Sequence, residues 1–353
     1  MNHRSPLASV GSTAMAVVLL LATAPVWTAT GSLVGQATYP DTPPSSPPED
    51  WGAVSINMED VPYPYPVETM GLSLFGKDLR MAYMDVAPAG PANGQTVVLL
   101  HGASYYGMYW EETMEALRQA GFRVVVPDQL GWGRSSKAII PYSLNLHAAN
   151  TQRLLEHLGV EEAAVVGHSM GGMLATRFAF MYPETTTHVV MVNQIGLVDN
   201  RKGRDWTDPT PHVGDEDLQA YYETRLALEE RRVVEWKPEF LEHVRIDWGW
   251  RLSAEWPRLA MVRALNTSAR NIDTVVYDWP QIATKALVIA GEEDGPDFPE
   301  LARNVAESFP NAELVLFPDV GHNPHLEAPE LFIPELILFL ESDPAAPAST
   351  DWR

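Results

Sequence analysis

The sequence predicts an α/β fold: a mostly parallel, doubly wound sheet with an inserted helical cap. Three observations support this prediction. Short apolar runs rich in β-branched residues recur along the chain, which is typical of strands buried on both faces of a parallel sheet. Helical patterns separate several of these runs. One long stretch, residues 196–279, has many charges and tryptophans but no buried-strand pattern.

Eight apolar runs are predicted to be strands. The first two, at 70–75 and 79–86, flank Gly76-Lys77-Asp78, a sequence typical of a β-hairpin turn. The six that follow are the predicted parallel strands, at residues 96–100, 122–126, 163–166, 188–192, 286–290 and 314–317.

Helical patterns fall between the strands and inside the insertion. After Ser143, a suitable N-cap, apolar side chains recur every three or four residues as far as Leu158, and Gly159 then ends the helix. Residues 217–234 and 254–265 are also predicted helices. The insertion, 196–279, is therefore expected to form a helical cap over a core made of residues 67–195 and 280–342.

Both ends of the chain are expected to lie outside this core. Residues 1–37 have the pattern of a secretory signal: a short positive start precedes an apolar stretch at 14–24 that is too short to span a bilayer comfortably. The cleavage site stays open, and an uncleaved membrane anchor is the alternative. Residues 38–66 contain eight prolines and are predicted to be a linker or N-terminal extension, with the alternative that the run 61–66 lies on the domain surface. Residues 343–353 are predicted to be a flexible tail. We expect a secreted or periplasmic protein.

Composition excludes several classes of function. Among the 353 residues, 46 are Asp or Glu and 24 are Lys or Arg, so the formal charge is -22 and the surface should repel nucleic acid and anionic membranes. The absence of cysteine excludes disulfides, thiolate nucleophiles and cysteine-ligated metals. Neither a dedicated metal-ligand cluster nor a phosphate-binding loop is present in the sequence. We therefore expect no metal and no cofactor, and a small-molecule substrate as the partner.

The strongest motif is the run from Gly167 to Gly171, which reads G-H-S-M-G. It follows the predicted strand 163–166 and precedes a helical pattern, which is the setting that a G-x-S-x-G nucleophile turn requires. A serine in such a turn sits on a strained backbone with its hydroxyl exposed, and a side chain at either glycine would crowd the turn. The motif predicts Ser169 as a nucleophile.

A nucleophilic serine needs a base, and the base needs a carboxylate that orients it. His322 follows the last predicted strand, and Asp294 follows the strand 286–290. Because the carboxyl ends of parallel strands meet at one edge of a sheet, we expect both beside Ser169. The chain order Ser, Asp, His agrees with this arrangement. The alternatives are His325 as the base and, as the acid, Asp297, Glu292 or Glu293.

Two backbone amides are expected to bind the oxyanion. One is the Met170 N–H, next to the nucleophile, and the other is the Ala103 N–H, in the loop after the strand 96–100. Four aromatic residues follow this loop and are candidates for an acyl pocket, but they could equally pack beneath the cap: Tyr105, Tyr106, Tyr109 and Trp110.

Several segments together resemble the α/β-hydrolase superfamily, specifically its capped single-domain members. They are HGA (101–103), DQLGWGRSS (128–136), GHSMGG (167–172), GEED (291–294) and GHNPHLEAPE (321–330), and the resemblance extends over residues 70–340. It implies a structural role at the sheet rim for Asp128, Gly131 and Gly133. Pro334 departs from the family's long final helix, which is therefore expected to begin near Ile333.

The resemblance and the motifs together predict a serine hydrolase that cleaves carboxylic esters through an acyl-serine intermediate. Serine rather than aspartate at position 169 argues against haloalkane dehalogenases and epoxide hydrolases of this fold. The alternatives are a carbon–carbon bond hydrolase, a lactonase, a perhydrolase, and a non-catalytic ligand-binding member.

Overall fold

The computed structural model describes residues 1, 39–103, 105–199, 201 and 217–346. Residues Met1–Leu33 and Val34–Arg353 form two separate units, and the second contains every element discussed below. The predicted signal segment 1–37 lies outside the described residues apart from Met1, and so does the last part of the predicted tail. In the described part of the chain, no helix has the length and apolar character needed to cross a membrane.

An eight-stranded sheet forms the centre of the second unit, in the order β1-β2-β4-β3-β5-β6-β7-β8. β1 pairs with β2 and β2 with β4 in antiparallel fashion, and all other pairs are parallel. The predicted hairpin and the mostly parallel sheet are thus confirmed. The strands are β1 (Glu68–Leu74), β2 (Lys77–Val86), β3 (Thr96–Leu100), β4 (Arg123–Pro127), β5 (Ala163–His168), β6 (Thr186–Val192), β7 (Lys285–Gly291) and β8 (Ala312–Phe317).

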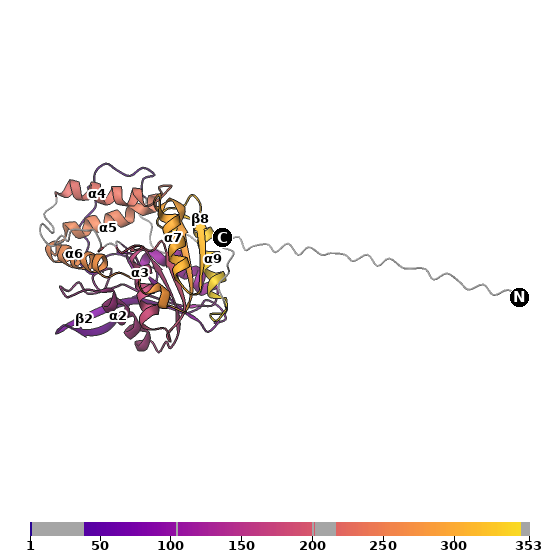
Figure 1. Cartoon of the computed structure of the whole chain (residues 1–353). Helices are drawn as coiled ribbons and strands as arrows, with labels where there is room; N and C mark the ends of the chain where they lie inside the picture. Colours follow the sequence, from indigo (N-terminus) through magenta and orange to yellow (C-terminus); the bar gives the residue numbers. More distant parts are fainter. Residues whose placement is uncertain (2–38, 104, 200, 202–216, 347–353) are drawn as a thin grey trace. The chain divides into compact units, whose positions relative to one another are not determined.

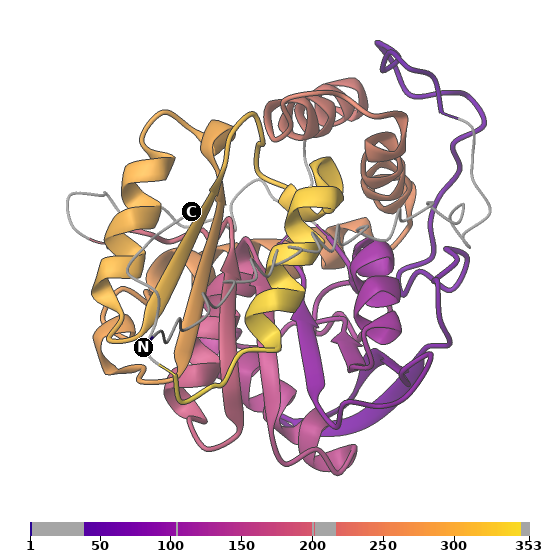
Figure 2. The same cartoon turned by 90° about the vertical axis from the view of Figure 1, so that its right-hand side faces the viewer.

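Helices cover both faces of the sheet (Figures 1 and 2). Leu287 and Ile289 of β7 pack into the hydrophobic cluster on one face, whereas Val288 and Ala290 pack into the cluster on the other. Because both faces are covered, the strands of the parallel part, β3 to β8, have largely continuous buried runs, whereas the edge strand β1 alternates between exposed and buried residues. One face carries α1 (Glu111–Gln119) and α9 (Pro329–Leu340), and the other carries α2 (Leu144–His157), α3 (Met170–Met181) and α7 (Phe298–Ser308).

The predicted boundaries of α2 are confirmed. The Ser143 Oγ accepts a hydrogen bond of 3.0 Å from the Leu146 N–H, and Gly159 has the positive φ of 66° that ends a helix. The prediction for α9 was wrong: this helix begins at Pro329, after the short α8 (Pro324–Glu327), and contains Pro334. Pro334 lies on the exposed face, where the carbonyl that loses its partner meets water, while buried Phe332 and Leu336 anchor the helix.

Among the described residues between β6 and β7, three α-helices form the cap, grouped at one end of the domain (Figure 1). They are α4 (Leu218–Arg231), α5 (Leu241–Leu252) and α6 (Trp256–Ile272). Asp217 caps α4 by accepting hydrogen bonds from two amides in its first turn. The cap has an aromatic core of its own, to which Tyr222, Trp248, Trp250 and Trp256 contribute.

The proline-rich segment 39–66 is not a linker, which corrects the prediction from composition. Val54, Met58 and Val61 are buried in the aromatic core of the cap. The Val54 N–H donates to the Gly249 carbonyl at 3.0 Å, and the Trp250 indole N–H donates to the Ser55 carbonyl at 3.0 Å. Because proline has no N–H to satisfy, such a segment can dock on a surface in an extended form. Here apolar residues between the prolines do the docking.

Asp128 organises the rim of the sheet, in agreement with the structural role that the resemblance implied. Its carboxylate accepts hydrogen bonds from the Gly107 N–H (2.7 Å), the Arg134 N–H (2.7 Å) and the Tyr63 hydroxyl (2.7 Å). A side chain at Gly133, where φ is 51°, would overlap this carboxylate. The loop therefore joins the proline-rich segment to the core.

Lys137, at the end of this loop, is a buried lysine with an unusual environment. It is 2% exposed, its ammonium group donates to the Gly133 and Ser135 carbonyls, and it lies 5.5 Å from the ring of Trp250. Burial lowers the pKa of Lys137 to about 7, against the opposing attraction of Asp128 and Glu59. The folded protein therefore releases the Lys137 proton at a pH about three units lower than an unfolded chain would.

Lys137→Met is expected to remove a pH dependence of stability. Since the unfolded chain keeps the Lys137 proton above pH 7 and the folded chain does not, the free energy of unfolding should rise with pH, by roughly 2 kcal/mol between pH 7 and pH 9. Urea unfolding at pH 7, 8 and 9 measures this rise. Lys77→Met, on the exposed hairpin, is the matched control and should keep it. An equal slope in Lys137→Met and the parent would refute the assignment.

Candidate active site

Four polar residues meet at the carboxyl edge of the sheet. Ser169 follows β5, Asn193 follows β6, Asp294 comes after β7, and His322 comes after β8. These four strands are parallel and adjacent in the order β5-β6-β7-β8. The topology therefore places residues that are far apart in the sequence at one edge of the sheet.

Ser169 occupies a strained turn between β5 and α3. Its φ is 57° and its ψ is -117°, a conformation that is costly for a residue with a side chain. The turn is held by the Ser169 N–H, which donates to the Val192 carbonyl at 2.9 Å. A side chain at Gly167 would overlap the Gly171 carbonyl, and one at Gly171 would overlap the Leu100 carbonyl, so the predicted need for both glycines is confirmed.

His322 donates its Nδ1–H to the Asp294 carboxylate, with 2.8 Å between Nδ1 and Oδ2. The same oxygen accepts a second hydrogen bond, of 3.0 Å, from the Asn193 side-chain amide. Asn193 also donates to the Gly321 carbonyl (3.1 Å) and accepts from the Gly291 N–H (3.0 Å). Asn193 thus links the loop that carries Asp294 to the loop that carries His322.

The role of Asn193 was not predicted from the sequence, because a single asparagine after a strand is not part of any recognisable motif. Its φ of 39° at the end of β6 is a conformation that asparagine tolerates better than most residues, but only the structure reveals it. The alternative residues are placed elsewhere. Asp297 directly precedes α7 and makes no capping hydrogen bond with its side chain, and the buried His325 packs against Trp110, with 4.2 Å between ring centroids. Burial keeps the pKa of His325 well below its ordinary value.

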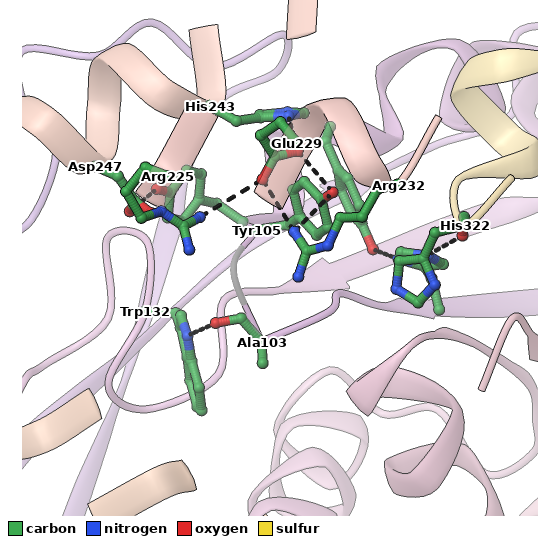
Figure 3. A network of polar contacts seen from close by, with 12 residues as sticks. Ala103, Tyr105, Trp132, Arg225, Glu229, Arg232, His243, Asp247 and His322 are labelled. Atoms are coloured by element: carbon green, nitrogen blue, oxygen red, sulfur yellow. Dashed lines mark hydrogen bonds and ion pairs between the residues drawn. The ribbon is translucent and has the colours of Figure 1, made fainter. Parts of the chain in front are cut away.

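The cap contacts the histidine loop directly. The His322 N–H donates to the Arg232 carbonyl, which ends α4, at 2.6 Å. The Arg232 guanidinium donates to the Tyr105 hydroxyl (3.1 Å) and to Glu229 (2.9 Å), and Figure 3 shows these groups between the cap and His322. One residue of the cap therefore joins the base to the loop after β3.

Buried charges connect this contact with the rest of the cap (Figure 3). Glu229 accepts from the Tyr105 hydroxyl at 3.0 Å, and Asp247 pairs with Arg225 at 2.6 Å. Burial disfavours the charge on Glu229, but Arg232, His243 and Arg225 together outweigh this effect and lower the pKa of the carboxyl to about 2. Glu229 therefore stays ionised at neutral pH, and the network keeps its charges paired.

The loop after β3 presents a peptide of fixed orientation. The Gly102 carbonyl accepts hydrogen bonds from the His101 Nδ1–H (2.8 Å) and the Tyr105 N–H (3.1 Å), and His101 Nε2 accepts from the Gln129 N–H (3.0 Å). Because a trans peptide points its N–H opposite to its carbonyl, these bonds also orient the Ala103 N–H. Within the described residues, neither this amide nor the Met170 N–H donates to a protein acceptor.

The four aromatic residues after this loop are all buried, and the hydroxyls of the three tyrosines bind protein groups. Tyr105 contacts Glu229 and Arg232, and the Tyr106 hydroxyl donates to Asp247 at 3.2 Å. Tyr109 stacks on Tyr105 with 4.9 Å between ring centroids, and Trp110 lies against Phe332 in the core. These contacts account for the four side chains as packing, and an acyl-binding role stays a prediction.

Comparisons with known proteins agree with this architecture. The family model described as the alpha/beta hydrolase fold matches residues 95–329. The chain belongs to this α/β-hydrolase family. The superfamily and the capped, mostly parallel fold predicted from the motifs are thus confirmed, and the match includes all three of Ser169, Asp294 and His322.

Several relatives of this hydrolase are known. A crystal structure of a probable hydrolytic enzyme from Pseudomonas aeruginosa PAO1 has a TM-score of 0.78 and 35% identity, and covers 82% of this chain and 99% of that one. A RutD protein of Caulobacter sp. (strain K31), named for carbamate hydrolysis, is 31% identical over 72% of this chain and 94% of its own. A 2-hydroxy-6-oxononadienedioate/2-hydroxy-6-oxononatrienedioate hydrolase of Paraburkholderia phymatum is 28% identical over 75% and 92%. These relatives support hydrolase activity.

Proposed function

We propose that this protein hydrolyses carboxylic esters through an acyl-serine intermediate. The observation that carries the proposal is the hydrogen bond of 2.8 Å between His322 Nδ1 and Asp294 Oδ2, at the same sheet edge as the strained Ser169 turn. With Nδ1 bearing the proton, Nε2 of a neutral His322 has the free electron pair that a general base needs.

The reaction divides into acylation and deacylation. Ser169 Oγ attacks the ester carbonyl while His322 Nε2 takes its proton, and the Asp294 carboxylate stabilises the imidazolium that forms. The Ala103 and Met170 N–H groups bind the oxyanion. The imidazolium then protonates the leaving alkoxide. A water molecule, deprotonated by His322, attacks the acyl-serine and releases the acid, which restores Ser169.

Carbamate hydrolysis is the second candidate, because the RutD relative is named for it and is 31% identical. The same groups would attack a carbamate carbonyl. The difference lies in deacylation: the nitrogen of a carbamoyl-serine donates electrons into the carbonyl and slows its hydrolysis. An enzyme built for esters therefore becomes trapped as a carbamoyl-serine, whereas an enzyme built for carbamates turns over.

Substrates with one leaving group and different acyl parts separate these candidates. We expect repeated turnover of p-nitrophenyl acetate and butyrate, and release of one equivalent of p-nitrophenol from p-nitrophenyl N-methylcarbamate. Absorbance of the released phenolate measures both. Sustained turnover of the carbamate with slower ester hydrolysis would replace the ester proposal by the second candidate. Ester and carbamate hydrolysis that persist unchanged in Ser169→Ala would contradict both.

A further inference from the structure

A chain of hydrogen bonds connects the two loops that flank the nucleophile. The Gly102 N–H donates to the Tyr109 hydroxyl oxygen at 3.0 Å. The Tyr109 hydroxyl lies 3.0 Å from His168 Nδ1, and His168 Nε2 lies 2.8 Å from the His322 carbonyl oxygen. Tyr109 is 7% exposed and His168 is fully buried, so water does not compete for these bonds.

Each proton in this chain has one possible place. The His322 carbonyl can only accept, so the hydrogen of His168 must be on Nε2. Burial, together with the nearby His325 and His322, holds the pKa of His168 well below its ordinary value, and the ring is therefore neutral. His168 Nδ1 thus carries no hydrogen and accepts one from the Tyr109 hydroxyl, whose oxygen accepts from Gly102 in turn.

The chain begins at the Gly102 N–H, in the peptide just before the one that presents the expected oxyanion donor. Gly102 is tightly packed beside the nucleophile: a methyl group at its Cα would lie 3.1 Å from Ser169 Cβ and 3.2 Å from His168 Nδ1. Tyr109 holds the N–H of Gly102, while His101 and the Tyr105 N–H hold its carbonyl. Together these three contacts fix Gly102 on both sides and so direct the next amide, that of Ala103.

We propose that Tyr109 and His168 are positioning residues that hold the oxyanion peptide Gly102-Ala103 and the base His322 in fixed places on opposite sides of Ser169. This inference rests on the proposed serine-hydrolase function. It assigns Tyr109 to the alignment of the reacting groups rather than to the acyl pocket. Alignment matters most in the transition state, where the oxyanion and the imidazolium form together, so its loss should lower kcat and leave KM unchanged.

Tyr109→Phe removes the hydroxyl and keeps the stacked ring. We expect kcat for p-nitrophenyl butyrate to fall at least about tenfold with KM within twofold, because the Gly102 N–H and His168 Nδ1 lose their partner. Tyr65→Phe is the matched control: that hydroxyl donates to Glu115 at 2.6 Å, on α1, and its loss should leave kcat unchanged. A rise in KM with constant kcat would show that Tyr109 lines the pocket and would overturn the proposal.

The two residues should also act through each other. In His168→Gln the side-chain amide can still donate to the His322 carbonyl, whereas His168→Ala has no donor. We expect the glutamine variant to recover most of the kcat that the alanine variant loses. The glutamine does not accept the hydrogen bond from the Tyr109 hydroxyl as His168 does. Tyr109→Phe should therefore lower kcat by a smaller factor in the His168→Gln background than in the parent. If the factor by which kcat falls in the double variant Tyr109→Phe/His168→Gln equalled the product of the two single-variant factors, the two residues would act independently, and the shared chain of hydrogen bonds would be contradicted.

A readout independent of turnover separates this proposal from the proposed function. In protein labelled with 15N-histidine, the ring signals that vanish in His168→Gln belong to His168. They should report a neutral ring with its hydrogen on Nε2 from pH 5 to pH 8, and Tyr109→Phe should shift the Nδ1 signal. A ring that titrates in this range, or carries its hydrogen on Nδ1, would refute the chain even in an active enzyme. If the His168 ring gave the expected signals but the protein had no hydrolase activity, the hydrogen-bond chain would stand and only the proposed function would be refuted.

Discussion

Ser169→Ala is expected to abolish hydrolysis while leaving the protein folded. In the proposed mechanism the variant lacks the atom that forms the acyl intermediate, so kcat should fall at least about 10⁴-fold. The remaining activity would come from water attacking a substrate that is still held beside the oxyanion amides. Steady-state hydrolysis of p-nitrophenyl butyrate, corrected for the uncatalysed rate, measures the loss.

The same change should hardly affect stability. The strained backbone conformation of this turn costs alanine about as much free energy as it costs serine. Ser169 also forms no side-chain hydrogen bond with the described residues, so the substitution removes none. The midpoint of thermal unfolding should therefore stay within a few degrees of that of the parent. Ser308→Ala, at the end of α7, is the matched serine control and should keep full activity. Activity in Ser169→Ala above a trace would remove this residue as the nucleophile.

Asp294→Asn is expected to lower kcat about 10⁴-fold. Asp294 accepts hydrogen bonds from His322 and Asn193 on one oxygen. In the proposed mechanism its negative charge stabilises the imidazolium that forms during acylation. Asparagine retains the size and an acceptor but has no charge, and it allows the wrong histidine tautomer. KM should change little, because the proposed mechanism gives this carboxylate a role toward His322 and not toward the substrate. The ratio of kcat in variant and parent is the measurement.

Asp297→Asn is the control that tests the choice of acid. Asp297 lies three residues further along the same loop, where it precedes α7, and has no hydrogen bond to His322 in the described part of the chain. Its substitution should leave kcat within about threefold of the parent. If this variant lost activity and Asp294→Asn did not, Asp297 would be the acid.

The expected triad could be found in the sequence because each member lies in a loop at the end of a recognisable strand. Continuous apolar runs gave the approximate places of β5, β7 and β8, and a parallel sheet brings their carboxyl ends to one edge. The helix cap at Ser143 was an equally local signal. In all these cases the decisive information lies within a few neighbouring residues.

Other features depend on contacts between distant segments, which no local pattern reveals. Asn193, His101 and Tyr109 obtain their roles from hydrogen bonds to other loops, so their residue types alone say little. The proline-rich segment was predicted to be a linker from its composition, yet burial of Val54 and Met58 against the cap decides its structure. For α9, packing of Phe332 and Leu336 outweighs the local cost of Pro334.

Reaction of the full-length purified protein with a fluorophosphonate probe tests the central claim most directly. The probe forms a stable bond with a serine only when a base activates the oxygen and nearby amides bind the phosphoryl oxygen. Mass spectrometry of the digested protein should place a single adduct on Ser169, and the adduct should be absent from Ser169→Ala and form much more slowly in Asp294→Asn. A folded protein that acquires no adduct, or an adduct on another serine, would contradict the serine-hydrolase account.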